Sequence, residues 1–132
     1  MASDTADSSA RRRTLLIADD EESVRLLVKV TIGADEFNVL EATDGDEAWS
    51  LIQEHKPALV LLDVRMPGPT GLEILKAMRS DTGLAGTKVI ILTASALPTD
   101  MAAGLTSGAD FYLTKPFSPR DLLARVDEAL LL

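Results

Sequence analysis

Acidic, hydroxyl and ammonium side chains follow four short apolar runs that lie far apart in this sequence. They are, in chain order, Asp19-Asp20-Glu21, Asp63, Thr93 and Lys115-Pro116. Carboxylates brought close together repel one another, and a bound cation relieves that repulsion. Because the chain has no cysteine and a single histidine, its ligands would be oxygen atoms, which favour a hard ion, Mg²⁺ or Mn²⁺.

Such a set of side chains is equipped for phosphoryl transfer, which uses a hard dication beside a carboxylate, an ammonium and a hydroxyl. The Asp63 carboxylate is a nucleophile that can form an acyl phosphate. The Lys115 ammonium can neutralise the phosphoryl oxygens, and the Thr93 hydroxyl can donate to one of them. Each residue alone also fits a cap, a turn or a surface position, so the prediction requires all of them to meet.

Parallel strands would bring these residues together. The apolar runs cover 14–18, 37–41, 58–62, 88–92 and 111–113. Four of the runs are apolar throughout, without alternation, which is typical of strands that are covered on both faces. In an open parallel sheet the carboxyl ends of all strands point the same way, and ligands bind there, where the strand order reverses.

Amphipathic stretches between the runs predict five helices. Their signals are an apolar face between residues 24 and 32, capping residues at 44, 70 and 118, and a stretch from about 98 to 107. Alternating strands and helices imply right-handed crossovers that place helices on both faces of the sheet. A closed barrel needs about eight such units, so we predict an α/β fold with a single open, parallel, five-stranded sheet.

The composition limits the classes of protein. The 132 residues, 46% of them hydrophobic, predict one domain over 14–132, preceded by a disordered N-terminal tail over 1–13. The net charge of −8 argues against direct binding to nucleic acid or to an acidic membrane surface. No apolar run approaches the roughly 20 residues that span a bilayer. Residues 1–13 also lack the apolar stretch of a secretory signal, so we predict a cytoplasmic protein.

The sequence resembles the receiver domain of bacterial two-component response regulators, such as those of chemotaxis. The matching segments are LLIADDEESVR, VLLDVRMPGPTGLEIL, VIILTA and GADFYLTKPF, which occur in the expected order. Together they cover about 14–131, and each falls at the end of a predicted strand. The resemblance implies the flavodoxin-like receiver fold, with strand order 2-1-3-4-5 and five helices on both faces of the sheet.

The resemblance also implies a role for each acidic residue. It makes Asp63 the phosphoacceptor. It makes Asp20 a direct ligand of the metal, with Asp19 acting directly or through water. The backbone carbonyl of Arg65 would complete the contacts that the protein makes to Mg²⁺ or Mn²⁺.

The remaining roles concern the phosphoryl group and the response to it. Lys115 would bind the phosphoryl group, and a cis peptide to Pro116 would shape its loop. Thr93 and Tyr112 would form a switch pair: on phosphorylation Thr93 turns toward the phosphoryl group, and Tyr112 moves inward into the space released.

Three positions would modulate the lifetime of the acyl phosphate. Arg65 lies two residues after the phosphoacceptor, and Ser95 lies two residues after the switch threonine. The Arg65 side chain has three alternatives, which are the phosphoryl group, Glu21 or solvent. Ala94 is small and would leave the phosphoryl group accessible.

In this family the donor is the phosphohistidine of a histidine kinase or phosphotransfer protein, and the receiver catalyses only its own phosphorylation and dephosphorylation. The output would be a changed surface on the fourth helix, fifth strand and fifth helix, which would bind an effector or form a homodimer. Candidate contacts on that surface are Asp100, Tyr112, Arg120 and Arg125.

Three alternative functions make different demands on these residues. A haloacid-dehalogenase-like, Mg²⁺-dependent phosphohydrolase needs an acid two residues after its nucleophile, where this chain has Arg65, and the chain leaves no room for a cap domain. A flavodoxin-like cofactor binder needs a Ser/Thr/Gly-rich loop where this chain has Asp19-Asp20-Glu21. The third alternative is a receiver-like scaffold that phosphorylation does not control.

Overall fold

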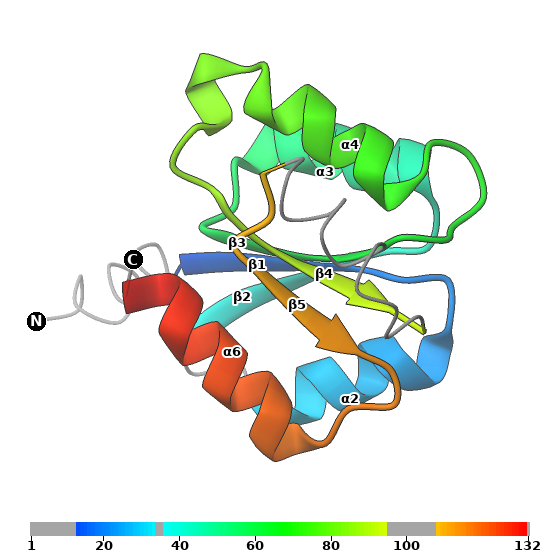
Figure 1. The fold of residues 1–132 in the computed structure, drawn as a ribbon, viewed down its shortest axis with the longest axis vertical. Helices are drawn as coiled ribbons and strands as arrows, with labels where there is room; N and C mark the ends of the chain where they lie inside the picture. The colour runs from blue at the N-terminus through cyan, green and yellow to red at the C-terminus, as the bar shows by residue number, and fades with distance from the viewer. Residues whose placement is uncertain (1–12, 34–35, 95–107, 132) are drawn as a thin grey trace, which may run out of the picture.

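A parallel sheet of five strands, in the order β2-β1-β3-β4-β5, forms the centre of the computed structural model (Figure 1). The structure describes residues 13–33, 36–94 and 108–131. The strands are β1 (Arg13–Ala18), β2 (Phe37–Ala42), β3 (Leu59–Asp63), β4 (Lys88–Thr93) and β5 (Phe111–Thr114). Both the strand order and the five predicted runs are confirmed, the runs to within one residue at each end.

Helices cover both faces of the sheet, as predicted. They are α2 (Glu22–Ile32), α3 (Gly45–His55), α4 (Gly71–Arg79) and α6 (Pro119–Leu131), with a short 3₁₀ helix, η1 (Thr82–Leu84). Figure 1 shows α2 and α6 on one face and α3 and α4 on the other. Four α-helices are thus described where five were predicted, because the predicted helix at 98–107 lies outside the described residues.

The three central strands, β1, β3 and β4, are buried on both sides, which explains their continuous apolar sequence. Alternate side chains of β1, β3 and β4 point to opposite faces, and those of the central residues are fully buried. One set, which includes Leu16 and Leu62, packs with residues of α3 and α4. The other set, which includes Leu15 and Leu61, packs with residues of α2 and α6. The carboxyl ends of the strands therefore rest on a core packed from both faces.

Three helices begin at the capping residues that the sequence predicted. Asp44 accepts a hydrogen bond from the backbone of the residue three positions on, and Thr70 forms a capping box with Glu73. At the start of α6 the Ser118 hydroxyl accepts from the backbone amide of the third residue along. The helix α2 differs, because its N-cap residue Glu21 makes no side-chain hydrogen bond to the helix.

Arg79, the last residue of α4, joins that helix to the segments that lead into β4 and β5. Its Nε donates to the carbonyl of Gly108 at 2.9 Å, and its Nη1 donates to the carbonyl of Thr87 at 2.8 Å. Its Nη2 donates to the Asp110 carboxylate at 3.2 Å, and the same carboxylate oxygen accepts from the backbone amide of Val89. One guanidinium thus fixes where β5 begins relative to β4.

We expect Arg79→Met to lower the free energy of unfolding by about 2–3 kcal/mol, because it leaves two carbonyls and a half-buried carboxylate without their donor. Urea denaturation measures the change. Arg120 is exposed on α6, and Arg120→Met, a matched loss of charge, should shift the same quantity by less than about 0.5 kcal/mol. Equal losses in the two variants would contradict this role of Arg79.

Candidate functional site

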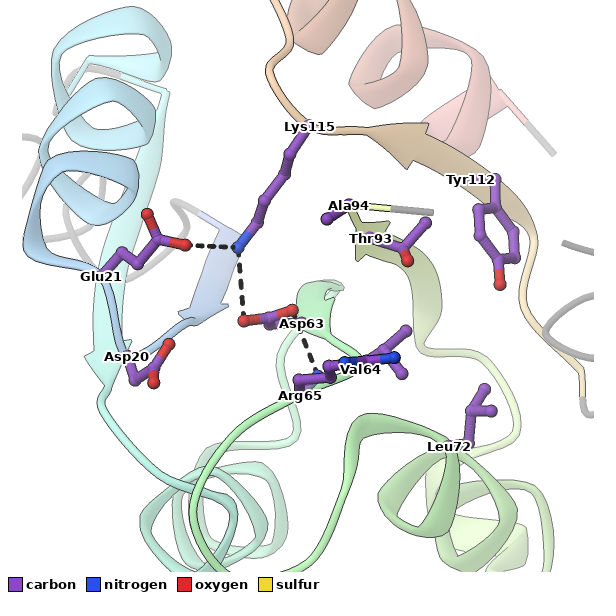
Figure 2. Close-up of a pocket in the computed structure, with 10 residues that line it drawn as sticks. All are labelled: Asp20, Glu21, Asp63, Val64, Arg65, Leu72, Thr93, Ala94, Tyr112 and Lys115. Carbon is purple, nitrogen blue, oxygen red and sulfur yellow. Dashed lines mark hydrogen bonds and ion pairs between the residues drawn. The ribbon is translucent and has the colours of Figure 1, made fainter. Parts of the chain in front are cut away.

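The carboxyl ends of β1, β3, β4 and β5 deliver the predicted residues to one edge of the sheet. A cavity of about 590 Å³ opens there. Figure 2 shows the Lys115 side chain reaching from the end of β5 toward Glu21 and Asp63. The cavity is lined by Asp20, Glu21, Asp63, Val64, Arg65, Leu72, Thr93, Ala94, Tyr112 and Lys115. Residues from four strand ends, as far apart in the sequence as Asp20 and Lys115, therefore share one site.

Lys115 is the cation around which the carboxylates gather. Its Nζ lies 2.6 Å from Asp19 Oδ2, 3.3 Å from Asp63 Oδ2 and 3.3 Å from Glu21 Oε1. The contact with Asp19 is an ion pair that lacks the orientation of a hydrogen bond. The peptide bond from Lys115 to Pro116 is cis, as the resemblance implied.

The pKa values of Asp63 and Lys115 show how charge is balanced in the site. Burial raises the pKa of Asp63 above its usual value, and the negative charge of Asp19 raises it further. Lys115 and the backbone amide of Arg65 lower that pKa without restoring it. Burial would lower the pKa of Lys115, but its contacts with Asp19 and Asp63 outweigh burial, and the pKa is raised. The Lys115 ammonium therefore does not fully offset the burial of the Asp63 carboxylate.

The donor set fits a hard dication. One carboxylate oxygen from each of Asp19, Asp20 and Glu21 lies within 4.8 Å of the other two. Three carboxylate oxygens that lie this close together could hold one hard cation. Asp19 is fully buried, and its Oδ2 pairs with the Lys115 ammonium at 2.6 Å without accepting a hydrogen bond, so this oxygen already faces a cation. Carboxylate oxygen atoms of this kind suit Mg²⁺ or Mn²⁺.

Arg65 lies in the loop that follows β3. Its backbone amide donates to Asp63 Oδ1 at 3.2 Å, which orients the carboxylate of the predicted phosphoacceptor. Its side chain is exposed and lines the cavity. Within the described part of the chain its guanidinium is exposed and makes no ion pair with Glu21, while its pairing with a phosphoryl group stays a prediction.

The two predicted switch residues lie on neighbouring strands beside the cavity. Both Thr93 and Tyr112 are buried, and Tyr112 pairs in register with Ile91, two residues before Thr93. Figure 2 shows Thr93 between Asp63 and Tyr112. At 9% exposure, Tyr112 already occupies an inward position and belongs to the core under α3 and α4. Ala94 is exposed at the rim of the cavity.

The remaining predicted residues lie away from the cavity or outside the described residues. Ser95 and Asp100 fall in the stretch that is not described. Arg120 is exposed on α6. Arg125, also on α6, pairs with Glu128 at 2.5 Å and lies over the ring of Phe111.

Two glycines position the loop between β3 and α4, and the sequence analysis did not identify them. A Cβ on Gly71 would lie 2.2 Å from the backbone oxygen of Asp63, and one on Gly45 would lie 2.1 Å from that of Pro69. Because both neighbours are backbone atoms, neither can move aside as a side chain can. The amide of Gly45 donates to the carbonyl of Pro67. In the sequence, the only indication of these contacts is that a glycine stands at the first position of α3 and of α4.

Arg25, also missed, holds the peptide on which the acidic cluster is built. Its Nη1 donates to the carbonyl of Asp19 at 2.9 Å, and its Nε binds Glu41 Oε1 at 3.1 Å. Lys29 Nζ lies 3.0 Å from the other oxygen of Glu41. The hydrogen bond from Lys29 lowers the pKa of Glu41, burial opposes it, and Arg25 lowers the pKa further.

This network predicts a pH-dependent contribution to stability. A lowered folded-state pKa means that ionised Glu41 stabilises the fold above its unfolded value of 4.5, and that the contribution is lost as the pH falls through the folded pKa. We expect Glu41→Gln to cost about 1 kcal/mol at pH 7 and much less at pH 3.5. Urea unfolding at the two pH values measures this, with Asp127→Asn on the exposed face of α6 as control. A pH-independent loss would contradict it.

The fold and the site together define an α/β receiver with an acidic, lysine-containing pocket, and the comparisons agree. Residues 15–127 match the response regulator receiver domain family. The chain belongs to this family of two-component signalling domains. The family match gives no support to the phosphohydrolase or flavodoxin-like alternatives.

Two curated relatives and one solved structure illustrate the similarity. The DNA-binding response regulator MtrA of Mycolicibacterium paratuberculosis is 36% identical over 115 residues, which are 87% of this chain and 50% of MtrA. The phosphate regulon transcriptional regulatory protein PhoB of Pseudomonas aeruginosa is 38% identical over 118 residues, 89% of this chain and 52% of PhoB. The chain thus spans about half the length of these relatives. The Vibrio cholerae chemotaxis protein CheY4 aligns with a TM-score of 0.83 and 33% identity, covering 90% of this chain and 99% of that one.

Among the described helices, none has both the length and the apolar character required to cross a membrane.

Proposed function

We propose that the chain is a switch operated by phosphorylation of Asp63, with the phosphohistidine of a histidine kinase or phosphotransfer protein as donor. The observation that carries the proposal is the meeting of Asp63 and Asp19 on one ammonium, that of Lys115, at 3.3 and 2.6 Å. A buried carboxylate beside a lysine and further acids is the arrangement that phosphoryl transfer to an aspartate requires.

In the proposed reaction an oxygen of the Asp63 carboxylate attacks phosphorus. The phosphorus–nitrogen bond of the donor breaks, its electron pair remains on the imidazole, and an acyl phosphate forms. Lys115 neutralises a phosphoryl oxygen, and the Thr93 hydroxyl donates to another. A bound Mg²⁺ would neutralise charge on the phosphoryl oxygens. Asp19, Asp20, Asp63 and the carbonyl of Arg65 would hold it.

The same site would limit the lifetime of the signal. Water attacks the phosphorus of the acyl phosphate, the phosphorus–oxygen bond breaks, and the Asp63 carboxylate and inorganic phosphate are released. Ala94, which is small and lies at the rim, leaves a path for that water, while Arg65 and Ser95 modulate the rate. The chain would act on no substrate other than its own phosphoryl group.

The proposed output is a population shift that passes from Thr93 to Tyr112. Because Tyr112 lies on β5, the shift would alter the surface that β5 and α6 form with the predicted helix at 98–107. An effector or a second copy of the chain would bind there. The net charge of −8 supports a protein partner for this domain rather than nucleic acid.

Acetyl phosphate, a small phosphodonor, tests the proposal directly. Incubation with the donor and Mg²⁺ should add the mass of one phosphoryl group, and peptide mapping should locate it on Asp63. Chelation of the metal by EDTA should suppress the addition. A chain that remains unmodified, or that is modified at another residue, would refute the proposal and would favour a scaffold that phosphorylation does not control.

A further inference from the structure

We propose that Glu21 occupies, in the resting chain, the Lys115 donor that a phosphoryl oxygen must take. Glu21 would then be a positioning residue that sets how readily an anionic phosphodonor enters the site. The inference rests on the proposed function, because it assumes that Lys115 binds the phosphoryl group.

The first step is what surrounds the Lys115 ammonium. Its Nζ donates to Glu21 Oε1 and Asp63 Oδ2, both at 3.3 Å, and lies 2.6 Å from Asp19 Oδ2. The Lys115 side chain is only 14% exposed, so water has little access to it. A phosphoryl oxygen can therefore reach the ammonium only if one carboxylate gives way.

The second step is which carboxylate gives way. Asp19 is fully buried and lies closest, at 2.6 Å, so its release would leave a buried charge without a partner. Asp63 is itself the proposed acceptor and is 8% exposed. Glu21 is 59% exposed and 3.3 Å away, so water solvates its carboxylate as soon as it leaves. Release of Glu21 is the least costly of the three.

The third step is where the Glu21 side chain points. Glu21 is the N-cap residue of α2, yet its side chain does not cap the helix. Its backbone amide donates to Asp19 Oδ1 at 2.9 Å, which fixes the residue beside the site. Figure 2 shows its carboxylate directed at the Lys115 ammonium across the mouth of the cavity. The carboxylate thus stands where an entering anion meets Lys115.

The test measures the affinity for beryllofluoride, an anion that mimics a phosphoryl group on a carboxylate, by calorimetry at saturating Mg²⁺. We expect Glu21→Gln to bind beryllofluoride about two- to fivefold more tightly than the unmodified chain, the range of an exposed ion pair. Glu21→Asp keeps the charge but is one methylene shorter, and its carboxylate is suited to capping α2 instead. It should tighten binding as Gln does.

Glu22→Gln is the matched control, because Glu22 is the exposed neighbour in the first turn of α2 and loses the same charge. Its affinity should equal that of the unmodified chain. Equal affinity for beryllofluoride in Glu21→Gln and the unmodified chain would overturn the inference. An unchanged affinity in Glu21→Asp would also overturn it, because the negative charge near the site, and not the contact with Lys115, would then set the affinity. Failure of the unmodified chain to bind beryllofluoride would instead refute the proposed function.

Discussion

Asp63→Asn is expected to abolish the phosphoryl adduct and to make the chain more stable in EDTA. Asparagine has nearly the same shape but no nucleophilic carboxylate, so no acyl phosphate forms. Burial and the charge of Asp19 raise the pKa of Asp63, so the ionised carboxylate destabilises the fold at neutral pH. Removing that charge should raise the free energy of unfolding by about 1 kcal/mol.

The sign of this second effect follows from the raised pKa. Stability that Asp63 provides when protonated is lost as the pH rises through its folded pKa, so the gain from asparagine is present at pH 7. The gain should vanish below the unfolded value of 3.8, where both side chains are neutral. Intact-mass analysis and urea unfolding measure the two effects, with Asp127→Asn as control. An adduct of equal yield, or a loss of stability at pH 7, would count against the assignment.

Lys115→Met is expected to lower the free energy of unfolding in EDTA by about 3 kcal/mol, because it leaves the buried Asp19 and the nearly buried Asp63 without a cation. Saturating Mg²⁺ should reduce the difference in free energy of unfolding between Lys115→Met and the unmodified chain. A ligand at a hundred times its dissociation constant contributes about 2.7 kcal/mol. In Lys115→Met the metal also no longer competes with an ammonium for the carboxylates of Asp19 and Asp63.

Lys76→Met, on the exposed face of α4, is the control for this prediction. Urea unfolding with EDTA and with Mg²⁺ should show a small change that is the same in both conditions. A Lys115→Met variant that loses as little as Lys76→Met would show that Lys115 does not stabilise the acids. If Mg²⁺ leaves the stability difference between Lys115→Met and the unmodified chain unchanged, the metal binds elsewhere.

The central strands were predictable because they are covered on both faces and therefore carry continuous apolar runs. The strand order followed from the resemblance to the receiver family. The starts of α3, α4 and α6 were predictable for another reason, since a capping side chain acts within three residues of itself. The start of α2 departs from this rule, because the Glu21 side chain pairs with Lys115, which follows β5. Sequence patterns within a few residues of Glu21 cannot predict a contact with a residue 94 positions away.

The meeting of Asp19, Asp63, Thr93 and Lys115 was predictable because parallel strands all end at the same edge of a sheet. The contacts that refine the site were not. The Arg25 guanidinium reaches both the carbonyl of Asp19 and the carboxylate of Glu41 only because β1 and β2 are neighbours, since Glu41 lies on β2. The inward position of Tyr112 likewise reflects packing under α3 and α4 rather than any property of its own segment.

The contact between Gly71 and the carbonyl of Asp63 has a mechanical consequence. Backbone meets backbone there, with no pliable side chain between the end of β3 and the first residue of α4. A small displacement at Asp63 would therefore be transmitted to that helix instead of being absorbed. The helix would carry it to Arg79 at its far end, and from there to the beginning of β5.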